Sequence, residues 1–169
     1  ILKQLFDVGS LFHLLTDKEV LKRSFIESAK CEIAYRPERK IESVEQVLND
    51  TIETALLIAR KDILKTDDEK AKYNEINTGI NQFRHFVFQG KFGILEAQVA
   101  SAKAAYLAAI ILKDYKDDLK VFNKGIPLPE YLITNPEYKY LNKRLKYVES
   151  GEALYYWFQT INLLFPSKL

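Results

Sequence analysis

Residues 93–121, GILEAQVASAKAAYLAAIILKDYKDDLKV, restrict the fold more than any other stretch of the chain. After Gly93 they contain neither Gly nor Pro, so nothing interrupts a helix of about 25 residues, about 37 Å long. Between Ala97 and Leu112 the only polar side chains are those of Gln98, Ser101, Lys103 and Tyr106. A helix that is apolar on nearly all sides is typical of the centre of a bundle. Its seven alanines let neighbouring backbones approach closely.

Capping signals divide the rest of the chain into further helices. The pattern Ser/Thr-x-x-Glu/Gln occurs at Thr16, Ser43 and Thr66 and predicts a helix start at each place. Asn135 followed by Pro136 predicts the start of a last helix. The expected helices are 2–15, 17–36, 44–64, 67–89, 93–121 and 135–165. Because no stretch of useful length alternates with the period of a strand, we predict an all-α fold, a single-domain bundle of about six helices around a central helix.

Length and composition are those of one soluble globular domain over residues 1–169, with residues 1–65 as a candidate N-terminal subregion. The longest uncharged stretches are too short to cross a bilayer, so we expect no membrane partner. The single cysteine, Cys31, excludes an internal disulfide and fits a reducing compartment, which predicts a cytoplasmic protein with Cys31 as a small buried side chain. No stretch near Ile1 resembles a secretory signal, and the absence of Met indicates that residues before Ile1 have been removed or are missing.

The residue types that carry most enzyme chemistry are scarce. The chain has two His and one Cys, and it contains no HExxH, CxxC or DxDxDG motif, no glycine-rich phosphate loop and no GxSxG elbow. His13 is followed by Asp17, but nothing else completes a ligand set, so a packed or half-exposed histidine is the favoured interpretation. We therefore predict no catalytic residue, no metal site, no cofactor and no enzymatic activity.

Charge is distributed unevenly, although the net charge is only +2. Residues 41–75 hold nine acidic and five basic side chains, whereas residues 134–169 hold three acidic and five basic ones. The near-neutral total argues against a protein that is basic all over its surface, so any basic surface has to be local.

The local basic surface lies in PEYKYLNKRLKYV, residues 136–148. At about 100° per residue, three lysines fall within about 60° of one another and three apolar side chains fall on the opposite face. The lysines are Lys139, Lys143 and Lys146, and the apolar residues are Leu141, Leu145 and Val148. Arg144 lies outside this lysine row, at the edge of the apolar face. Such a row could contact phosphates without reading sequence, and the alternative is an ordinary solvated helix face.

Two further segments combine charged and aromatic residues. In residues 82–86 the aromatic side chains have the spacing of a core face, which leaves Arg84 toward the outside. In residues 152–158 the spacing places Glu152 along the apolar face, where a carboxylate needs a partner. Lys103 of the central helix is the candidate partner, and a surface location for both residues is the alternative.

Three segments read TGINQFRHF (residues 78–86), AAYLAA (104–109) and EALYY (152–156). Together they resemble the small helical subunits of CRISPR effector complexes, particularly the small subunit of the Csm-type (type III) interference complex. That family has an early Thr-Ser-Gln-Leu/Ile-Arg-Lys-Phe-like segment, a middle Leu-x-Tyr-Ala-Ala-like helix and a late Glu-Ala-x-x-Ala-Tyr segment. The resemblance covers about residues 76–159, and it departs from the family in lacking the Arg expected after the Ala-Ala pair and in the longer spacing from Thr78 to Gln82.

The resemblance implies a non-catalytic subunit of a CRISPR ribonucleoprotein complex that acts in antiviral defence. Copies would stack along a guide RNA–target duplex and contact the RNA or RNA–DNA backbone through Lys and Arg without reading sequence. The implied nucleic-acid-binding residues are Arg84, Lys139, Lys143 and Lys146, with Arg144 beside them.

The competing interpretation is a helical protein–protein interaction or scaffold domain with no nucleic-acid role. The C-terminal helix carries more aromatic surface than one helix face normally buries, which favours other protein subunits or self-association as partners. These aromatic residues are Tyr155, Tyr156, Trp157, Phe158 and Phe165. A bundle that encloses a small apolar ligand is a third alternative.

Overall fold

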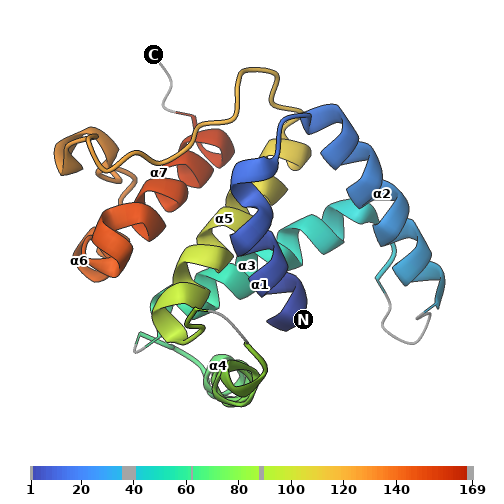
Figure 1. Ribbon diagram of the computed structural model, residues 1–169, viewed down its shortest axis with the longest axis horizontal. Helices are drawn as coiled ribbons and strands as arrows, with labels where there is room; N and C mark the ends of the chain where they lie inside the picture. Colours follow the sequence, from blue (N-terminus) through green and yellow to red (C-terminus); the bar gives the residue numbers. More distant parts are fainter. Residues whose placement is uncertain (1, 36–40, 62, 88–89, 167–169) are drawn as a thin grey trace.

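The computed structural model describes residues 2–35, 41–61, 63–87 and 90–166, and within them it contains seven α-helices and no strand (Figure 1). The prediction of an all-α bundle is therefore confirmed. The α-helices are α1 (Leu2–Leu11), α2 (Lys18–Tyr35), α3 (Val44–Arg60), α4 (Asp67–Phe83), α5 (Ile94–Leu112), α6 (Tyr140–Leu145) and α7 (Glu152–Leu164). Short 3-10 helices accompany them as η1 (Phe12–Leu14), η3 (Arg84–Phe86), η4 (Leu128–Tyr131) and η5 (Val148–Gly151).

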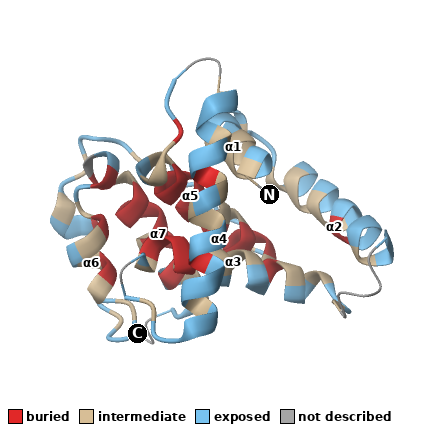
Figure 2. Ribbon diagram, turned by 90° about the horizontal axis from the view of Figure 1, so that it is seen from below, coloured by how far each residue is buried: buried red, intermediate tan, exposed pale blue. Residues whose placement is uncertain are grey.

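Helix α5 is the centre of the bundle, as its composition predicts. It packs against α3, α7 and α1, and 13 of its 19 residues are buried. Buried residues are concentrated in α5 and α7, whereas α2 and α4 lie outside them and are largely exposed (Figure 2). By length and composition alone α5 could cross a membrane, and it is the one such helix among the described residues; 72% of its most apolar window is buried inside the protein.

Small side chains bring α1 and α5 into close contact. A Cβ atom added to Gly9 would lie 2.8 Å from the Cβ atom of Ala100, which is closer than two carbon atoms can approach. Ala97, Ala102 and Ala105 on the same central helix are fully buried. The alanines of α5 therefore set the distance at which its neighbours pack.

Two of the three predicted capping boxes are present as expected, and the third, at Thr16, is replaced by a single N-cap hydrogen bond one residue later. The Ser43 and Thr66 hydroxyls accept hydrogen bonds from the backbone N–H groups of Gln46 at 3.2 Å and Glu69 at 3.1 Å. At the start of α2, Asp17 rather than Thr16 accepts the bond, from the N–H of Val20 at 2.9 Å. A carboxylate at this position satisfies the same otherwise unpaired N–H group.

The prediction that the central helix continues to Val121 is wrong, because α5 ends at Leu112. Asp114 has a left-handed backbone with φ of 50°, and the chain then folds back over the bundle. Two buried tyrosines hold this returning segment through hydrogen bonds to its backbone. The Tyr106 hydroxyl accepts from the N–H of Lys120 at 3.1 Å, and the Tyr156 hydroxyl accepts from the N–H of Phe122 at 3.2 Å. These tertiary hydrogen bonds replace helical ones. Residues 113–120 are mostly polar, so a helix there would gain little stability from packing.

The prediction of one helix over residues 135–165 is also wrong. The segment forms α6 and α7 with η5 between them, and Glu149 and Gly151 in η5 have positive φ of 45° and 95°. Leu141 in α6 and Tyr156 in α7 are both completely buried. The break allows both short helices to reach the core, which one straight helix could not do over this length.

Three other predicted helices end earlier than expected. Helix α1 stops at Leu11, and η1 follows it. Helix α3 stops at Arg60 rather than near Leu64. The next residue, Lys61, has a positive φ of 47°. Helix α4 stops at Phe83, and η3 follows it. Gln89, the predicted end of that helix, lies outside the described residues.

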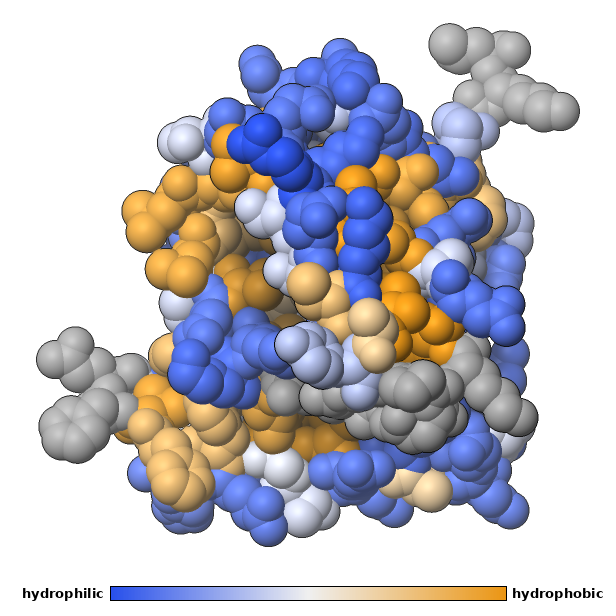
Figure 3. All heavy atoms as spheres, turned by 90° about the vertical axis from the view of Figure 1, so that its right-hand side faces the viewer, coloured by the Kyte–Doolittle hydropathy of each residue, from blue (hydrophilic) through white to orange (hydrophobic). Residues whose placement is uncertain are grey.

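Helix α2 projects from the bundle, and the prediction of a buried Cys31 is wrong. Ala29 is its one buried residue, and Cys31 is exposed. Helix α2 packs mainly on α3, so most of its side chains have little to be buried against. On the side of the molecule that carries α2, apolar surface lies between hydrophilic side chains (Figure 3).

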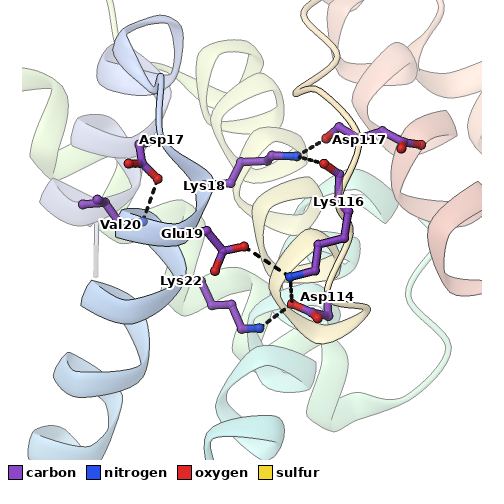
Figure 4. A network of polar contacts seen from close by, with 8 residues as sticks. All are labelled: Asp17, Lys18, Glu19, Val20, Lys22, Asp114, Lys116 and Asp117. Atoms are coloured by element: carbon purple, nitrogen blue, oxygen red, sulfur yellow. Dashed lines mark hydrogen bonds and ion pairs between the residues drawn. The ribbon is translucent and has the colours of Figure 1, made fainter.

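Charged side chains attach the first turns of α2 to the segment after α5 (Figure 4). Lys22 pairs with Asp114, and this ion pair together with the nearby Lys116 lowers the pKa of the Asp114 carboxyl. Lys116 pairs with Glu19 at 3.2 Å, and the Lys18 ammonium donates to the carbonyl oxygen of Lys116 at 2.9 Å. Because these groups are exposed, they orient α2 more than they stabilise it.

The two buried tyrosine hydroxyls predict a loss of stability at high pH. Burial raises the pKa of Tyr106 to about 12 and raises the pKa of Tyr156 as well. The protonated, neutral hydroxyl is the form that the fold retains, so this stability is complete below the unfolded pKa of about 10 and is lost as the pH rises toward 12.

We expect the free energy of unfolding, measured with urea, to fall by up to about 1.4 kcal/mol per pH unit for each tyrosine in this range. Tyr106→Phe should be less stable than the wild type near neutral pH and should show a shallower alkaline loss. An unchanged slope in Tyr106→Phe would contradict the assignment.

Candidate functional site

The segment before and through α6 has the two faces that the sequence predicts. Lys139 and Lys146 flank α6 and have right-handed helical backbone angles, so the helical backbone extends over residues 139–146. On the inner face Leu141 and Leu145 are fully buried and Val148 is buried. On the outer face Lys139 and Lys143 are exposed and Lys146 is half-buried.

The lysine row (Lys139, Lys143 and Lys146) has no ion-pair partner among the described residues. The Lys146 ammonium lies 4.7 Å from the centre of the Tyr147 ring, and that ring is 81% exposed. The row therefore presents two solvated ammonium groups and a third one against an exposed aromatic face. A phosphate could be bound by the lysines, and a nucleic-acid base could stack on the tyrosine.

The two arginines predicted for this site lie in different surroundings. Arg144 is half-buried within α6, beside the row. Arg84 is exposed on η3, which packs on α4, whereas α6 packs on α3, α7 and η5. The structure therefore places Arg84 on a separate element, and its role in binding stays a prediction.

Lys103 and Glu152 form a buried ion pair, so the sequence-based pairing is confirmed and the surface alternative is wrong. The Lys103 Nζ atom lies 2.9 Å from Glu152 Oε1, and the two side chains are 6% and 19% exposed. The same ammonium lies 3.4 Å from the carbonyl oxygen of Gly9 and 5.5 Å from the ring centre of Phe12. The pair joins α1, α5 and α7 inside the bundle, and this explains why a lysine occurs on the apolar central helix.

His13 lies at the outer edge of this buried pair. It is exposed, and its Nε2 atom is 3.5 Å from Lys103 Nζ. Over the described residues no group of three or more His, Cys, Asp or Glu side chains is arranged to hold a metal ion.

Most of the aromatic side chains of the C-terminal helix are buried within the protein itself. Tyr155, Tyr156 and Trp157 are buried, Phe158 is half-buried, and Phe165 is 46% exposed. The expected surplus of apolar surface on this helix is therefore mostly absent, because the segment after α5, η4 and η5 cover it. Self-association through this end stays a prediction that now depends on Phe165.

No family model, no curated protein and no solved structure matches the chain. Two of the three segments that carry the sequence resemblance, residues 104–109 and 152–156, lie in α5 and α7 and are mostly buried. Their side chains therefore determine how the bundle packs. Within the third segment, Arg84 is exposed.

Proposed function

We propose that this chain is a non-catalytic helical binding domain that contacts the phosphate backbone of RNA through the lysine row. The observation that carries the proposal is the geometry of residues 139–148. Leucines anchored in the core hold three lysines outward, and no described carboxylate neutralises them. Membership of a CRISPR ribonucleoprotein complex is a narrower proposal that rests on the sequence resemblance alone.

The chemistry of the row favours binding without sequence readout. A lysine ammonium is a point charge that attracts a phosphate from many directions, whereas the bidentate contacts that identify guanine come mostly from arginine. Exposed Tyr147 supplies a face on which any base can stack. Exposed Glu137 and Glu149 lie beyond the two ends of the row and limit the length of backbone that it can bind.

Binding of a labelled single-stranded RNA, measured by fluorescence anisotropy, should depend strongly on salt. If all three lysines contact phosphates, the logarithm of the binding constant should fall against the logarithm of salt with a slope of about −2. Replacing Lys139, Lys143 and Lys146 by Glu should weaken binding at about 50 mM salt by about 100-fold or more, because each contact becomes a repulsion.

The matched control carries the same change in charge elsewhere. Lys65, Lys91 and Lys124 are exposed on three other segments, and their replacement by Glu should have a much smaller effect. Equal weakening in the two triple variants would show that only the overall charge matters and would overturn the proposed site. Undetectable binding of RNA by the wild-type protein at about 50 mM salt would overturn the function itself.

A protein-interaction domain is the second candidate, and a different surface favours it. Between α3 and α4 the structure contains a groove of about 940 Å³ with an apolar floor. None of the three lysines of the row lines this groove, so the two functions are compatible.

A further inference from the structure

The groove lies where α4 crosses α3 on the outside of the bundle. Helix α3 runs across the view of Figure 1 and α4 is seen nearly end-on, so the two helices cross at a steep angle, and residues of both line the groove at this corner. Leu2 of α1 and Tyr138 before α6 complete the lining. Figure 2 shows that most of α4 is exposed, so this corner opens to solvent.

The floor and the edge of the groove differ in chemistry. Leu2, Leu56, Leu57 and Ile76 supply an apolar floor. The edge carries five carboxylates and two basic groups. The acidic residues are Asp50, Glu53, Asp68, Glu69 and Glu75, and the basic ones are Arg60 and Lys72.

Both basic residues of the groove are already paired. Arg60 contacts Glu69 at 2.8 Å and also donates to the Tyr140 hydroxyl at 3.0 Å. Lys72 contacts Asp68 at 2.9 Å. The Arg60–Glu69 pair closes the end of the groove where the two helices are joined in sequence.

Three carboxylates therefore form no direct ion pair among the described residues. They are Asp50 and Glu53 on α3 and Glu75 on α4. The attraction of Asp50 and Glu53 contributes, after that of Asp68, to the raised pKa of Lys72, so one ammonium on α4 is shared by acidic groups on both helices. These carboxylates would attract a ligand that brings further positive charge.

A second, smaller cavity adjoins the groove across α3. It has a volume of about 430 Å³ and shares Glu53, Leu56 and Tyr138 with the groove. Trp157, the only tryptophan of the chain, lines this second cavity, and its indole N–H has no hydrogen-bond partner among the described residues. The apolar floor therefore continues past Leu56 toward α7.

We propose that this groove docks a lysine- or arginine-rich amphipathic helix of a partner protein. The apolar side of such a helix would cover Leu56, Leu57 and Ile76, and its basic residues would meet Asp50, Glu53 and Glu75. Apolar anchors flanked by complementary charge are the usual means by which a groove selects a helix. A bare metal ion is a poor occupant because the described carboxylates form no metal-holding group, and nucleic acid is excluded by like charge.

The probe is a labelled, leucine- and lysine-containing peptide of about 14 residues with apolar side chains at i, i+3, i+4 and i+7. Its anisotropy should rise on titration with the full chain, and added salt should weaken the complex. Asp50→Lys with Glu53→Lys should weaken binding at least about 10-fold, because two attractions become repulsions. Glu27→Lys with Glu130→Lys, which makes the same change in charge at exposed positions on α2 and η4, should leave binding unchanged.

Three results would overturn this docking site. A scrambled peptide of equal charge that binds equally well would show attraction by charge alone. Equal loss in the two double variants would show that the groove is not the site. Concentration-dependent dimers of the wild type, seen by light scattering and abolished by Asp50→Lys with Glu53→Lys, would identify a second copy as the occupant. Because the lysine-row variant should bind the peptide normally, failure here and failure of RNA binding are distinguishable.

Discussion

Glu152→Gln is expected to lower the free energy of unfolding by about 3 kcal/mol, because it leaves the Lys103 ammonium charged and buried without its counter-ion. Gln keeps the shape of the side chain and one acceptor oxygen, so the variant removes mainly the negative charge. The remaining neighbours of the ammonium are the Gly9 carbonyl, His13 and the faces of Phe12 and Tyr156. None of them carries a full negative charge.

Urea unfolding followed by circular dichroism measures this effect. The informative control is the double variant Lys103→Met with Glu152→Leu, which replaces the pair by apolar groups of similar volume. We expect it to be more stable than Glu152→Gln and close to the wild type, because a buried pair costs about as much in desolvation as its attraction returns. Equal losses in Glu152→Gln and in the double variant would show that the side chains matter by shape and that the charge pairing does not.

Gly151→Ala is expected to cost about 2–4 kcal/mol of unfolding free energy. Gly151 has φ of 95°, which an L-residue with a side chain adopts only under strain. An added Cβ atom would also lie 2.5 Å from the Tyr131 hydroxyl and 3.4 Å from the Lys146 carbonyl oxygen. Tyr131 is itself buried, so it cannot move away without disturbing η4 and the start of α7.

Gly90→Ala separates the two causes. Gly90 has a similar φ of 89°, but an added Cβ atom would have no neighbour within 4 Å. It should therefore report the backbone strain alone, about 1 kcal/mol, and the remaining loss in Gly151→Ala is the steric part. A Gly90→Ala loss as large as that of Gly151→Ala would contradict the steric part of the explanation.

Local signals predicted most of the helix starts and the identity of the central helix. Ser43 and Thr66 were sufficient because a capping box involves residues only three apart. The apolar character of α5 predicted a buried helix, because at the surface such a helix would expose apolar side chains to water. The pairing of Lys103 with Glu152 was also accessible, since each stood alone as a charge on an apolar face.

Helix ends were predicted less well, because distant residues decide them. The stop after Leu112 depends on Tyr106 and Tyr156, whose hydroxyls bind the returning backbone. The break before α7 depends on Gly151 fitting against Tyr131. Neither contact can be inferred from the residues next to the break.

The two candidate surfaces differ in the same way. The lysine row lies within residues 139–146, so a helical projection was enough to find it. The groove draws Leu2, Asp50, Glu53, Ile76 and Tyr138 from separate segments. In the sequence the groove was indicated only by the acidic excess of residues 41–75. That excess did not indicate an apolar floor.

The amino-acid sequence by itself determined the helical class, the central position of α5, the helix caps and the two-faced character of the segment around α6. These depend on periodicity and on contacts within one turn, which are local. Only the tertiary structure decided where α5 ends and where α7 begins, that Cys31 is exposed, and that α3 and α4 enclose an acidic groove. These depend on which distant surfaces meet, because packing between helices outweighs the small local preference of each residue.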